Sequence, residues 1–322
     1  MPNSMIAVFF IFVLKTVALA NKVYTKIPCP DFCECKSIGK IKCSVESLPL
    51  SLPAGKFKRV SFDNKGETLV DIPAPVIKMQ PNTSIDTLVL QYLNISTIKT
   101  NAFEGLGNVE LLLISHSSIK KIEPYAFRNL NITKFMFLNE SVDTIESFAF
   151  SEINAASFNI YKSNVNTIQT AAFNKITSKL IIASSTIEDM QAQAVSNGTL
   201  AGFVAVKSKI IQFGCNDFHN ISLLKIKANT TCDCNSVWLM EKVLTSYANL
   251  EYITCLAPPS LAGISLSQLN KTDVCNSSTI TDSVCPSLTF KMEFIKSNAN
   301  KWDASLTILV FVISYILFIS LK

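Results

Sequence analysis

The side chains most able to take part in chemistry are ten cysteines and two histidines, because these residue types act as nucleophiles and bind metals. The two histidines, His116 and His219, lie far apart in the chain, which disfavours a multi-histidine metal site. Neither histidine belongs to a G-x-S-x-G nucleophile motif, and nine glycines in all form no phosphate-binding loop. We therefore expect a protein that is not an enzyme, and we name no catalytic residue, no metal ligand and no cofactor.

The cysteines form two groups near the ends of the chain. The first group is Cys29, Cys33, Cys35 and Cys43, the second is Cys232, Cys234, Cys255 and Cys275, and Cys215 and Cys285 remain. A zinc site would need paired Cys-x2-Cys spacings or nearby histidines, and the sequence has neither. In a secreted protein, cysteines are expected to form disulfides. Spacing alone leaves three alternatives for the last two: they pair with each other, remain free or link two chains.

The two ends of the chain predict secretion and membrane attachment. Residues 1–20 hold an apolar run followed by Ala18-Leu19-Ala20, which is typical of a cleaved signal peptide, with an uncleaved anchor as the alternative. Residues 306–322 hold sixteen uncharged residues and then Lys322. A helix formed by these sixteen residues would be shorter than a bilayer core is thick. Because small residues and a polar spacer precede it, a GPI-attachment signal is favoured over a short single-pass anchor.

Nine Asn-x-Ser/Thr sequons agree with an extracellular location. The predicted glycosylation sites are Asn82, Asn94, Asn131, Asn139, Asn197, Asn220, Asn229, Asn270 and Asn276. The composition is 48% hydrophobic and only 16% charged, with a net charge of +5. This small charge excess disfavours a nucleic-acid partner, and the abundance of apolar residues argues against disorder.

The middle of the chain repeats. If Phe103, Phe127, Phe150, Phe173, Val195 and Phe218 are taken as anchors, successive anchors lie 24, 23, 23, 22 and 23 residues apart. The positions five, eight, thirteen and fifteen residues before each anchor are all apolar. The positions fifteen and thirteen before an anchor are two residues apart, so they share one face of a short strand. Such units bury their apolar residues by stacking on one another.

The segment Ile85-x-x-Leu88-x-Leu90, followed by Ile95, Ile98 and Ala102-Phe103, resembles the extracellular leucine-rich repeat. The resemblance implies an α/β-type right-handed horseshoe with a parallel concave sheet, a mostly irregular convex side with short helical turns, and disulfide-rich caps. The family usually has asparagine ten residues before the anchor, where this sequence has Leu93, Ser117, Glu140, Ser163, Ser185 and Ser208. We therefore expect weaker bonding between neighbouring turns.

The cysteine groups resemble the N- and C-terminal caps of the same family. The resemblance implies the pairings Cys29 with Cys35, Cys33 with Cys43, Cys232 with Cys255 and Cys234 with Cys275. The expected organisation is a signal peptide (1–20), an N-terminal cap (28–60), about six regular repeats and one irregular repeat (61–222), a C-terminal cap (223–285), a stalk (286–305) and the C-terminal segment (306–322). The irregular repeat is expected to run through Val60, Phe62, Leu69 and Ile72.

The residues that flank the buried strand pair predict a binding surface. They occupy the positions fourteen and twelve residues before each of the six anchors. Nine of these twelve positions are apolar or aromatic, whereas the solvent face of a sheet is normally polar. The candidate partner-binding residues are Val89, Leu113, Met136, Leu138, Tyr161 and Ile181. Tyr92, His116, Lys162 and Lys207 would rim this surface, and a glycan at Asn139 would narrow access to it. The alternative is that strand propensity alone explains these residues, or that glycans or the chain's own tail cover them.

The expected function is recognition or adhesion at the outer surface of the plasma membrane. The partner would be an extracellular protein ligand or a cell-surface receptor, or a lipid-like surface, engaged by the concave face, with the C-terminal segment as the membrane attachment. The alternatives are a secreted noncatalytic binding subunit or an extracellular-matrix protein, and an antigen receptor like those of jawless vertebrates.

Overall fold

The computed structural model describes residues 24, 26, 29–64, 68–196, 200–215, 223–240 and 252–275. The predicted signal peptide, stalk and C-terminal segment lie outside these residues. Across the part that is described, no helix combines the length and the apolar character needed to cross a membrane.

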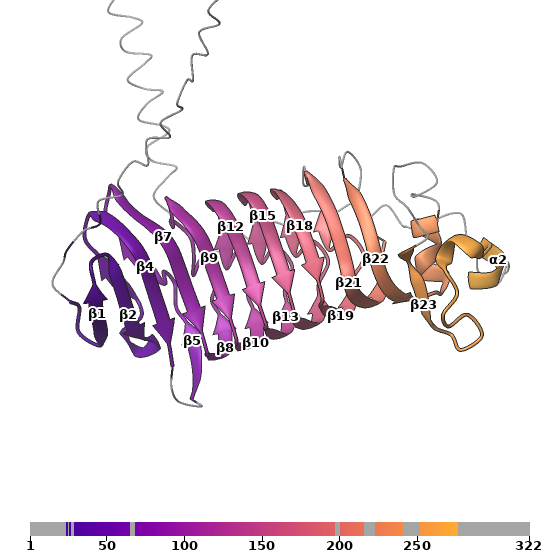
Figure 1. The fold of residues 1–322 in the computed structure, drawn as a ribbon, viewed down its shortest axis with the longest axis horizontal. Helices are drawn as coiled ribbons and strands as arrows, with labels where there is room; N and C mark the ends of the chain where they lie inside the picture. Colours follow the sequence, from indigo (N-terminus) through magenta and orange to yellow (C-terminus); the bar gives the residue numbers. More distant parts are fainter. Residues whose placement is uncertain are drawn as a thin grey trace, which may run out of the picture. The chain divides into compact units, whose positions relative to one another are not determined.

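The first strand row is a continuous parallel ladder that contains the longest strands (Figure 1). Its members are β2 (Lys40–Ser44), β4 (Gly55–Asp63), β7 (Thr83–Gln91), β9 (Val109–Ser115), β12 (Asn131–Leu138), β15 (Asn154–Tyr161), β18 (Thr177–Ala183), β21 (Gly202–Phe213) and β22 (Leu224–Thr231). The apolar positions fifteen and thirteen before each anchor pair with their equivalents on the next strand, as the repeat spacing predicts. The solenoid of parallel strands is confirmed.

The convex side differs from the expected irregular chain with helical turns, because it is built from two further rows of parallel strands. The second strand row consists of β5 (Leu69–Ile72), β8 (Asn94–Ile98), β10 (Ser118–Ile122), β13 (Ser141–Ile145), β16 (Asn164–Ile168), β19 (Thr186–Met190) and the second half of β21. The third strand row consists of β11 (Phe127–Arg128), β14 (Phe150–Ser151), β17 (Phe173–Asn174) and β20 (Val195–Ser196). The helical segments among the described residues all lie in the caps rather than in the repeats.

The corners between strands use residues with left-handed backbone conformation. At the corner from the first row to the second, φ lies between 52° and 58° in Tyr92, His116, Asn139, Lys162, Ser184 and Lys207. This conformation is uncommon for residues other than glycine, asparagine and aspartate. Its recurrence in every repeat shows that the stacked turns impose the corner regardless of side chain.

The core runs between the three strand rows. Every repeat position that we predicted to be apolar and that the structure describes is buried; Phe218 lies outside these residues. The rings of Phe103, Phe127, Phe150 and Phe173 stack on one another, with successive centroids 4.5, 4.8 and 5.1 Å apart. In the irregular repeat, Val60, Phe62 and Ile72 are buried, whereas Leu69 is 46% exposed. Val70 packs against the core instead and pairs with Ile95.

The caps close the two ends of this core. At the N-terminal end, β1 (Cys33–Ser37) pairs antiparallel with β2, η1 spans Val45–Ser47, and β3 (Leu50–Leu52) pairs with β6 (Ile77–Met79). The disulfides there are Cys29–Cys35 and Cys33–Cys43. The C-terminal cap contains η2 (Cys234–Ser236), β23 (Thr254–Ala257), η4 (Leu266–Gln268) and α2 (Lys271–Val274).

The C-terminal cap covers the last turn with Trp238, whose ring packs edge-on against Phe213 at a centroid distance of 5.5 Å. Its disulfides are Cys232–Cys255 and Cys234–Cys275. The four described bridges are the pairings that the family resemblance implied. Cys215 is also disulfide-bonded, and Cys285 lies outside the described residues.

Candidate binding surface

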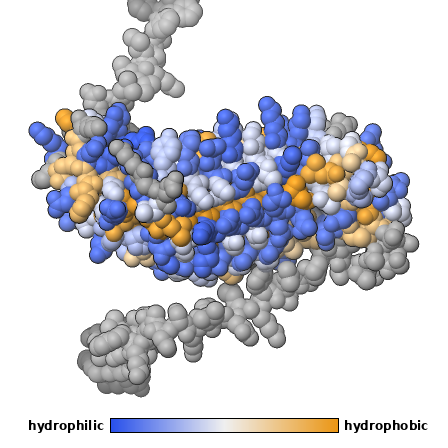
Figure 2. Space-filling model, turned by 90° about the horizontal axis from the view of Figure 1, so that it is seen from below, coloured by the Kyte–Doolittle hydropathy of each residue, from blue (hydrophilic) through white to orange (hydrophobic). Residues whose placement is uncertain are grey.

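The predicted binding residues lie in two outward-facing lines across the first strand row. One line pairs Val89, Leu113, Met136, Asn159, Ile181 and Val204 in register, and the other pairs Gln91, Ser115, Leu138, Tyr161, Ala183 and Val206. Figure 2 shows an apolar band that follows the array between hydrophilic side chains. The structure therefore brings the candidate residues into two adjacent lines, as strand alternation predicts.

The degree of exposure divides the candidate residues. Val89 is completely buried although it does not belong to the core cluster, so it offers no surface to a partner. Near it on β7, Asp86 accepts a hydrogen bond of 2.7 Å from Tyr24 Oη, which places Tyr24 at this end of the row. Leu113, Met136, Leu138 and Ile181 are half-buried, and Tyr161 is 36% exposed.

We call the accessible part of the two lines the apolar stripe. Its members are Leu113, Met136, Leu138, Tyr161, Ile181, Ala183, Val204 and Val206. Asn159 interrupts the stripe with a polar group that is already bonded, since Nδ2 donates to Phe135 O at 3.2 Å and to Ser157 Oγ at 3.0 Å. A partner that covers the stripe would therefore bury mainly apolar surface without leaving this NH2 group unbonded.

The corner beside the stripe is hollowed. A depression of about 750 Å³ is lined by Tyr92, His116, Asn139, Glu140 and Lys162, among others. The rings of Tyr92 and His116 lie 5.1 Å apart, and Lys162 Nζ lies 5.4 Å from the centroid of the Tyr161 ring. The corner residues expected to rim the surface thus lie at the edge of the stripe, on the corner between the first and second rows.

A ladder of side-chain hydrogen bonds runs beneath this corner. Ser117 Oγ accepts from Leu93 N at 3.1 Å, Glu140 Oε1 accepts from Ser117 N at 3.3 Å, and Ser163 Oγ accepts from Glu140 N at 3.1 Å. Ser185 and Ser208 continue the series toward the C-terminal end. We expected weaker lateral bonding where serine replaces asparagine; side chains bond turn to turn over five consecutive steps, four through serine hydroxyls and one through the Glu140 carboxyl. Serine suffices because the corner brings each backbone N–H close to the next side chain.

Glu140 is the one ionisable member of this ladder. The residue is only 3% exposed, and its Oε2 has no hydrogen-bond partner among the residues that the structure describes. Desolvation by burial raises the pKa of Glu140 to about 9, and the hydrogen bond from the Ser117 backbone opposes this shift. At neutral pH the carboxyl is therefore protonated, and the ladder contains a neutral acid.

A second ladder, which the sequence reasoning missed, follows the corner after the second row. Glu123 Oε2 accepts from Thr100 N at 2.9 Å, Gln169 Oε1 from Ser147 N at 3.1 Å and Gln191 Oε1 from Thr170 N at 3.2 Å. The available signal was the recurrence of Glu or Gln four residues before the anchor.

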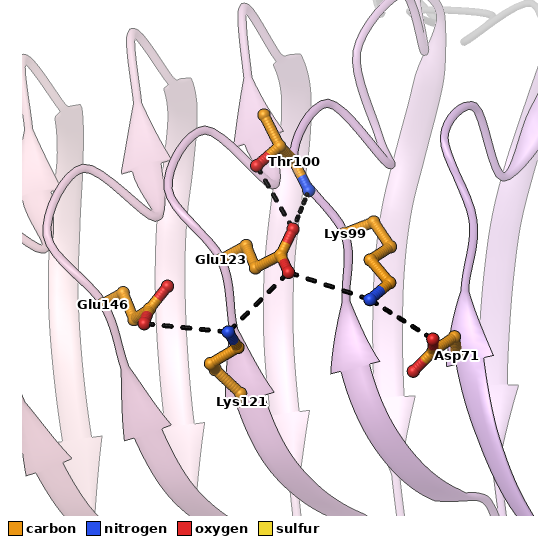
Figure 3. A network of polar contacts seen from close by, with 6 residues as sticks. All are labelled: Asp71, Lys99, Thr100, Lys121, Glu123 and Glu146. Atoms are coloured by element: carbon orange, nitrogen blue, oxygen red, sulfur yellow. Dashed lines mark hydrogen bonds and ion pairs between the residues drawn. The ribbon is translucent and has the colours of Figure 1, made fainter. Parts of the chain in front are cut away.

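Proline interrupts the second ladder at Pro124, which has no backbone N–H to donate to Glu146. Glu146 lies 3.9 Å from Lys121 Nζ instead, and Lys121 also reaches Glu123, as Figure 3 shows. Lys99 continues this surface network to Asp71. Because these lysines are exposed, the network contributes little stability compared with the backbone bonds.

The predicted glycosylation sites fall at different depths. Asn82, Asn131, Asn139 and Asn270 are exposed, whereas Asn94 and Asn229 are half-buried. Asn197, Asn220 and Asn276 lie outside the described residues. Asn139 lines the hollow, so a glycan at this residue would stand next to the stripe.

No chemical centre assembles around the described histidine. His116 lies on the corner and stacks on Tyr92, while His219 lies outside the described residues. Within the described ranges, no three His, Cys, Asp or Glu side chains cluster in a way that could hold a metal ion.

Comparison with known proteins agrees with the repeat geometry. The family described as "BspA type Leucine rich repeat region" matches residues 79–201 in six copies. Residues 79–201 of this chain therefore contain leucine-rich repeats of this type. Leucine-rich repeats stack into solenoids that present extended binding surfaces, and they typically serve as non-catalytic scaffolds for protein interaction.

One solved structure with a similar course is the crystal structure of human 5T4 (Wnt-activated inhibitory factor 1, Trophoblast glycoprotein). The similarity covers 77% of this chain and 100% of the 5T4 chain, at 14% sequence identity and a TM-score of 0.44. A search among curated proteins found no significant match to the sequence.

Proposed function

We propose that this leucine-rich-repeat protein is a non-enzymatic extracellular recognition protein that binds a protein partner through the apolar stripe. The observation that carries the proposal is the cross-strand alignment of apolar residues on the outward face of the first row. Outward positions of the second row are mainly polar, for example Asp143, Thr144, Asn166 and Thr167. The contrast between two rows of the same repeats argues against strand propensity as the cause of the stripe.

Several features support an extracellular site of action. Four disulfide-bonded cysteines lie in each cap, Cys215 before the C-terminal cap is a ninth, and such bridges persist in oxidising compartments. The predicted signal peptide and the nine sequons support the same compartment. Attachment by the segment 306–322, as a GPI signal or a short single span, is part of the proposal.

A binding experiment tests the role of the stripe. The double variant Met136→Asp/Leu138→Asp introduces charge into the stripe, and Thr144→Asp/Thr167→Asp is the matched control at half-buried outward positions of the second row. Each secreted protein would be applied to an array of extracellular domains from the same organism. We expect a partner that binds the unaltered protein and the control but not the stripe variant.

The result that would contradict the proposal is a partner whose binding survives the stripe variant while both variants keep normal secretion and circular dichroism. Membrane attachment is tested separately by treating intact cells with a phosphatidylinositol-specific phospholipase. Release of the protein supports a GPI anchor, whereas surface protein that resists the enzyme and requires detergent supports a short membrane span. Protein found only in the medium would favour the secreted alternative.

A further inference from the structure

Exposed lysines gather where the apolar stripe ends. In the two lines that form the stripe, Val204 pairs with Lys225 and Val206 pairs with Lys227 on the next strand. Lys207 and Lys209 follow on β21 at the adjoining corner. We call Lys207, Lys209, Lys225 and Lys227 the lysine corner. All four side chains are exposed, and none of them forms an ion pair with a carboxylate of the described residues.

Three of these lysines share a depression with an aromatic ring. Lys207, Lys209 and Lys227 line a hollow of about 420 Å³ together with Asn229 and Tyr252. Lys227 Nζ lies 5.2 Å from the centroid of the Tyr252 ring, which is 44% exposed. The backbone fixes this arrangement, because Lys209 pairs with Asn229 and Asn229 pairs with Thr254 in adjacent parallel strands.

Uncompensated charges of one sign in a single depression create a positive potential that attracts anions. Of the other lysines on the repeats, Lys99 and Lys121 pair with carboxylates, whereas exposed ones such as Lys120 have no ion pair among the described residues. What sets the lysine corner apart is that three of its lysines line a single hollow. The lysine corner lies beyond the end of the apolar stripe, so a ligand of this corner is independent of the protein partner proposed for the stripe.

We propose that the lysine corner binds a sulfated polysaccharide. The ammonium groups would contact sulfates, the exposed ring of Tyr252 would pack against the apolar face of a sugar, and Asn229 would bond to hydroxyl groups. Among the described residues no arginine lines the hollow, so they do not supply the planar fork that recognises carboxylate or phosphate in bidentate fashion. Each lysine carries its charge on a flexible side chain, so several lysines can contact sulfates at variable spacing.

Two other anionic partners fit the lining less well. An anionic membrane is usually engaged by basic residues together with aliphatic side chains that enter the bilayer, and no aliphatic side chain lines the hollow among the described residues. An acidic peptide would gain most from arginine pairs, which this corner lacks. Both become outcomes of the experiment.

The test measures binding of a heparin oligosaccharide to the full-length protein secreted from cells that glycosylate it. The variant Lys207→Gln/Lys209→Gln/Lys227→Gln removes the charges of the hollow. Lys40→Gln/Lys78→Gln/Lys120→Gln removes the same charge from exposed lysines elsewhere. We expect the first variant to bind about 10- to 100-fold more weakly at roughly physiological salt, and the control to stay within about twofold.

Four results would overturn the proposal. They are no heparin binding by the unaltered protein, equal weakening in both variants, equal binding of desulfated heparin, or preference for poly-glutamate or phosphatidylserine vesicles over the oligosaccharide. Mass spectrometry of the peptide that contains Asn229 tests independently whether this residue carries a glycan. Because Asn229 lines the hollow and lies in a sequon, a glycan on this residue in the secreted protein would also overturn the proposal.

Discussion

Replacing Glu140 with glutamine isolates the effect of a single buried ionisation on the stability of the solenoid. Glutamine keeps the carbonyl-type oxygen that accepts from Ser117 N and places an NH2 group where Oε2 has no partner. A protonated carboxyl likewise places a donor at that position, so the neutral forms of the two side chains are close equivalents. The substitution therefore changes little except the ability to ionise.

The magnitude follows from proton linkage. The pKa of Glu140 is about 9 in the folded protein against an ordinary value of 4.5, because burial penalises the charged form. The folded state therefore holds the proton more tightly, and its stability falls as the pH rises from the unfolded pKa through the folded pKa. Between these two pKa values, each pH unit lowers the free energy of unfolding by about 1.4 kcal/mol. The total loss at pH 7 is about 3 kcal/mol.

The assay is urea denaturation of the secreted protein at about pH 5 and about pH 8, with disulfides intact. From the lower to the higher pH, we expect the free energy of unfolding of the unaltered protein to fall by about 4 kcal/mol relative to that of Glu140→Gln. The variant should therefore be the more stable protein at the higher pH. Glu188→Gln, at an exposed position of β19, is the matched control and should follow the unaltered protein.

Parallel pH profiles for the unaltered protein and Glu140→Gln would refute the reasoning. Such a result would mean that Glu140 ionises in the folded state near its ordinary pKa. A Glu140→Gln protein that is less stable than the unaltered protein at both pH values would also refute it, because it would show that the charged carboxylate stabilises the ladder.

Two further variants test the ladder and the core. Ser163→Ala removes the acceptor for Glu140 N at a buried corner and should cost about 1–3 kcal/mol in urea denaturation. Ser118→Ala, at an exposed position nearby, should be nearly neutral, and equal costs would contradict a role for the ladder. Phe150→Ala opens the stack between Phe127 and Phe173 and should cost about 3–5 kcal/mol, seen as a lower unfolding midpoint or reduced secretion. A loss below about 1 kcal/mol would mean that the neighbouring rings close the gap.

Local spacing was sufficient to predict the first strand row. Leu112 and Ile114, two residues apart, must face the same side of a strand, and the same pair recurs in every unit at nearly constant spacing. Register between strands then follows from stacking equivalent residues, as the pairing of Leu112 with Phe135 shows. The second row was not predicted, because Ile119 and Ile122 are three residues apart and do not follow the period of a strand.

The binding surface was predicted in outline but not in detail. Strand alternation placed Val89 on the same line as Leu113, yet Val89 is buried while Leu113 is accessible. The exposure of an outward residue depends on what lies over it, which the spacing of its own repeat does not report. The lysine corner was missed for a related reason, since Lys207 and Tyr252 are distant in sequence and meet only where the last repeat joins the cap.

The sequence by itself determined that the chain repeats, which residues of each repeat are buried, and that cysteine-rich segments flank the array. These are periodic or local properties, and burial in a solenoid must recur with the period of its units. Only the tertiary structure decided that the convex side is made of strands, that serine hydroxyls bond turn to turn, and that Glu140 is a neutral acid. Those outcomes depend on distances between neighbouring turns and on the exclusion of water, which arise only when the units stack.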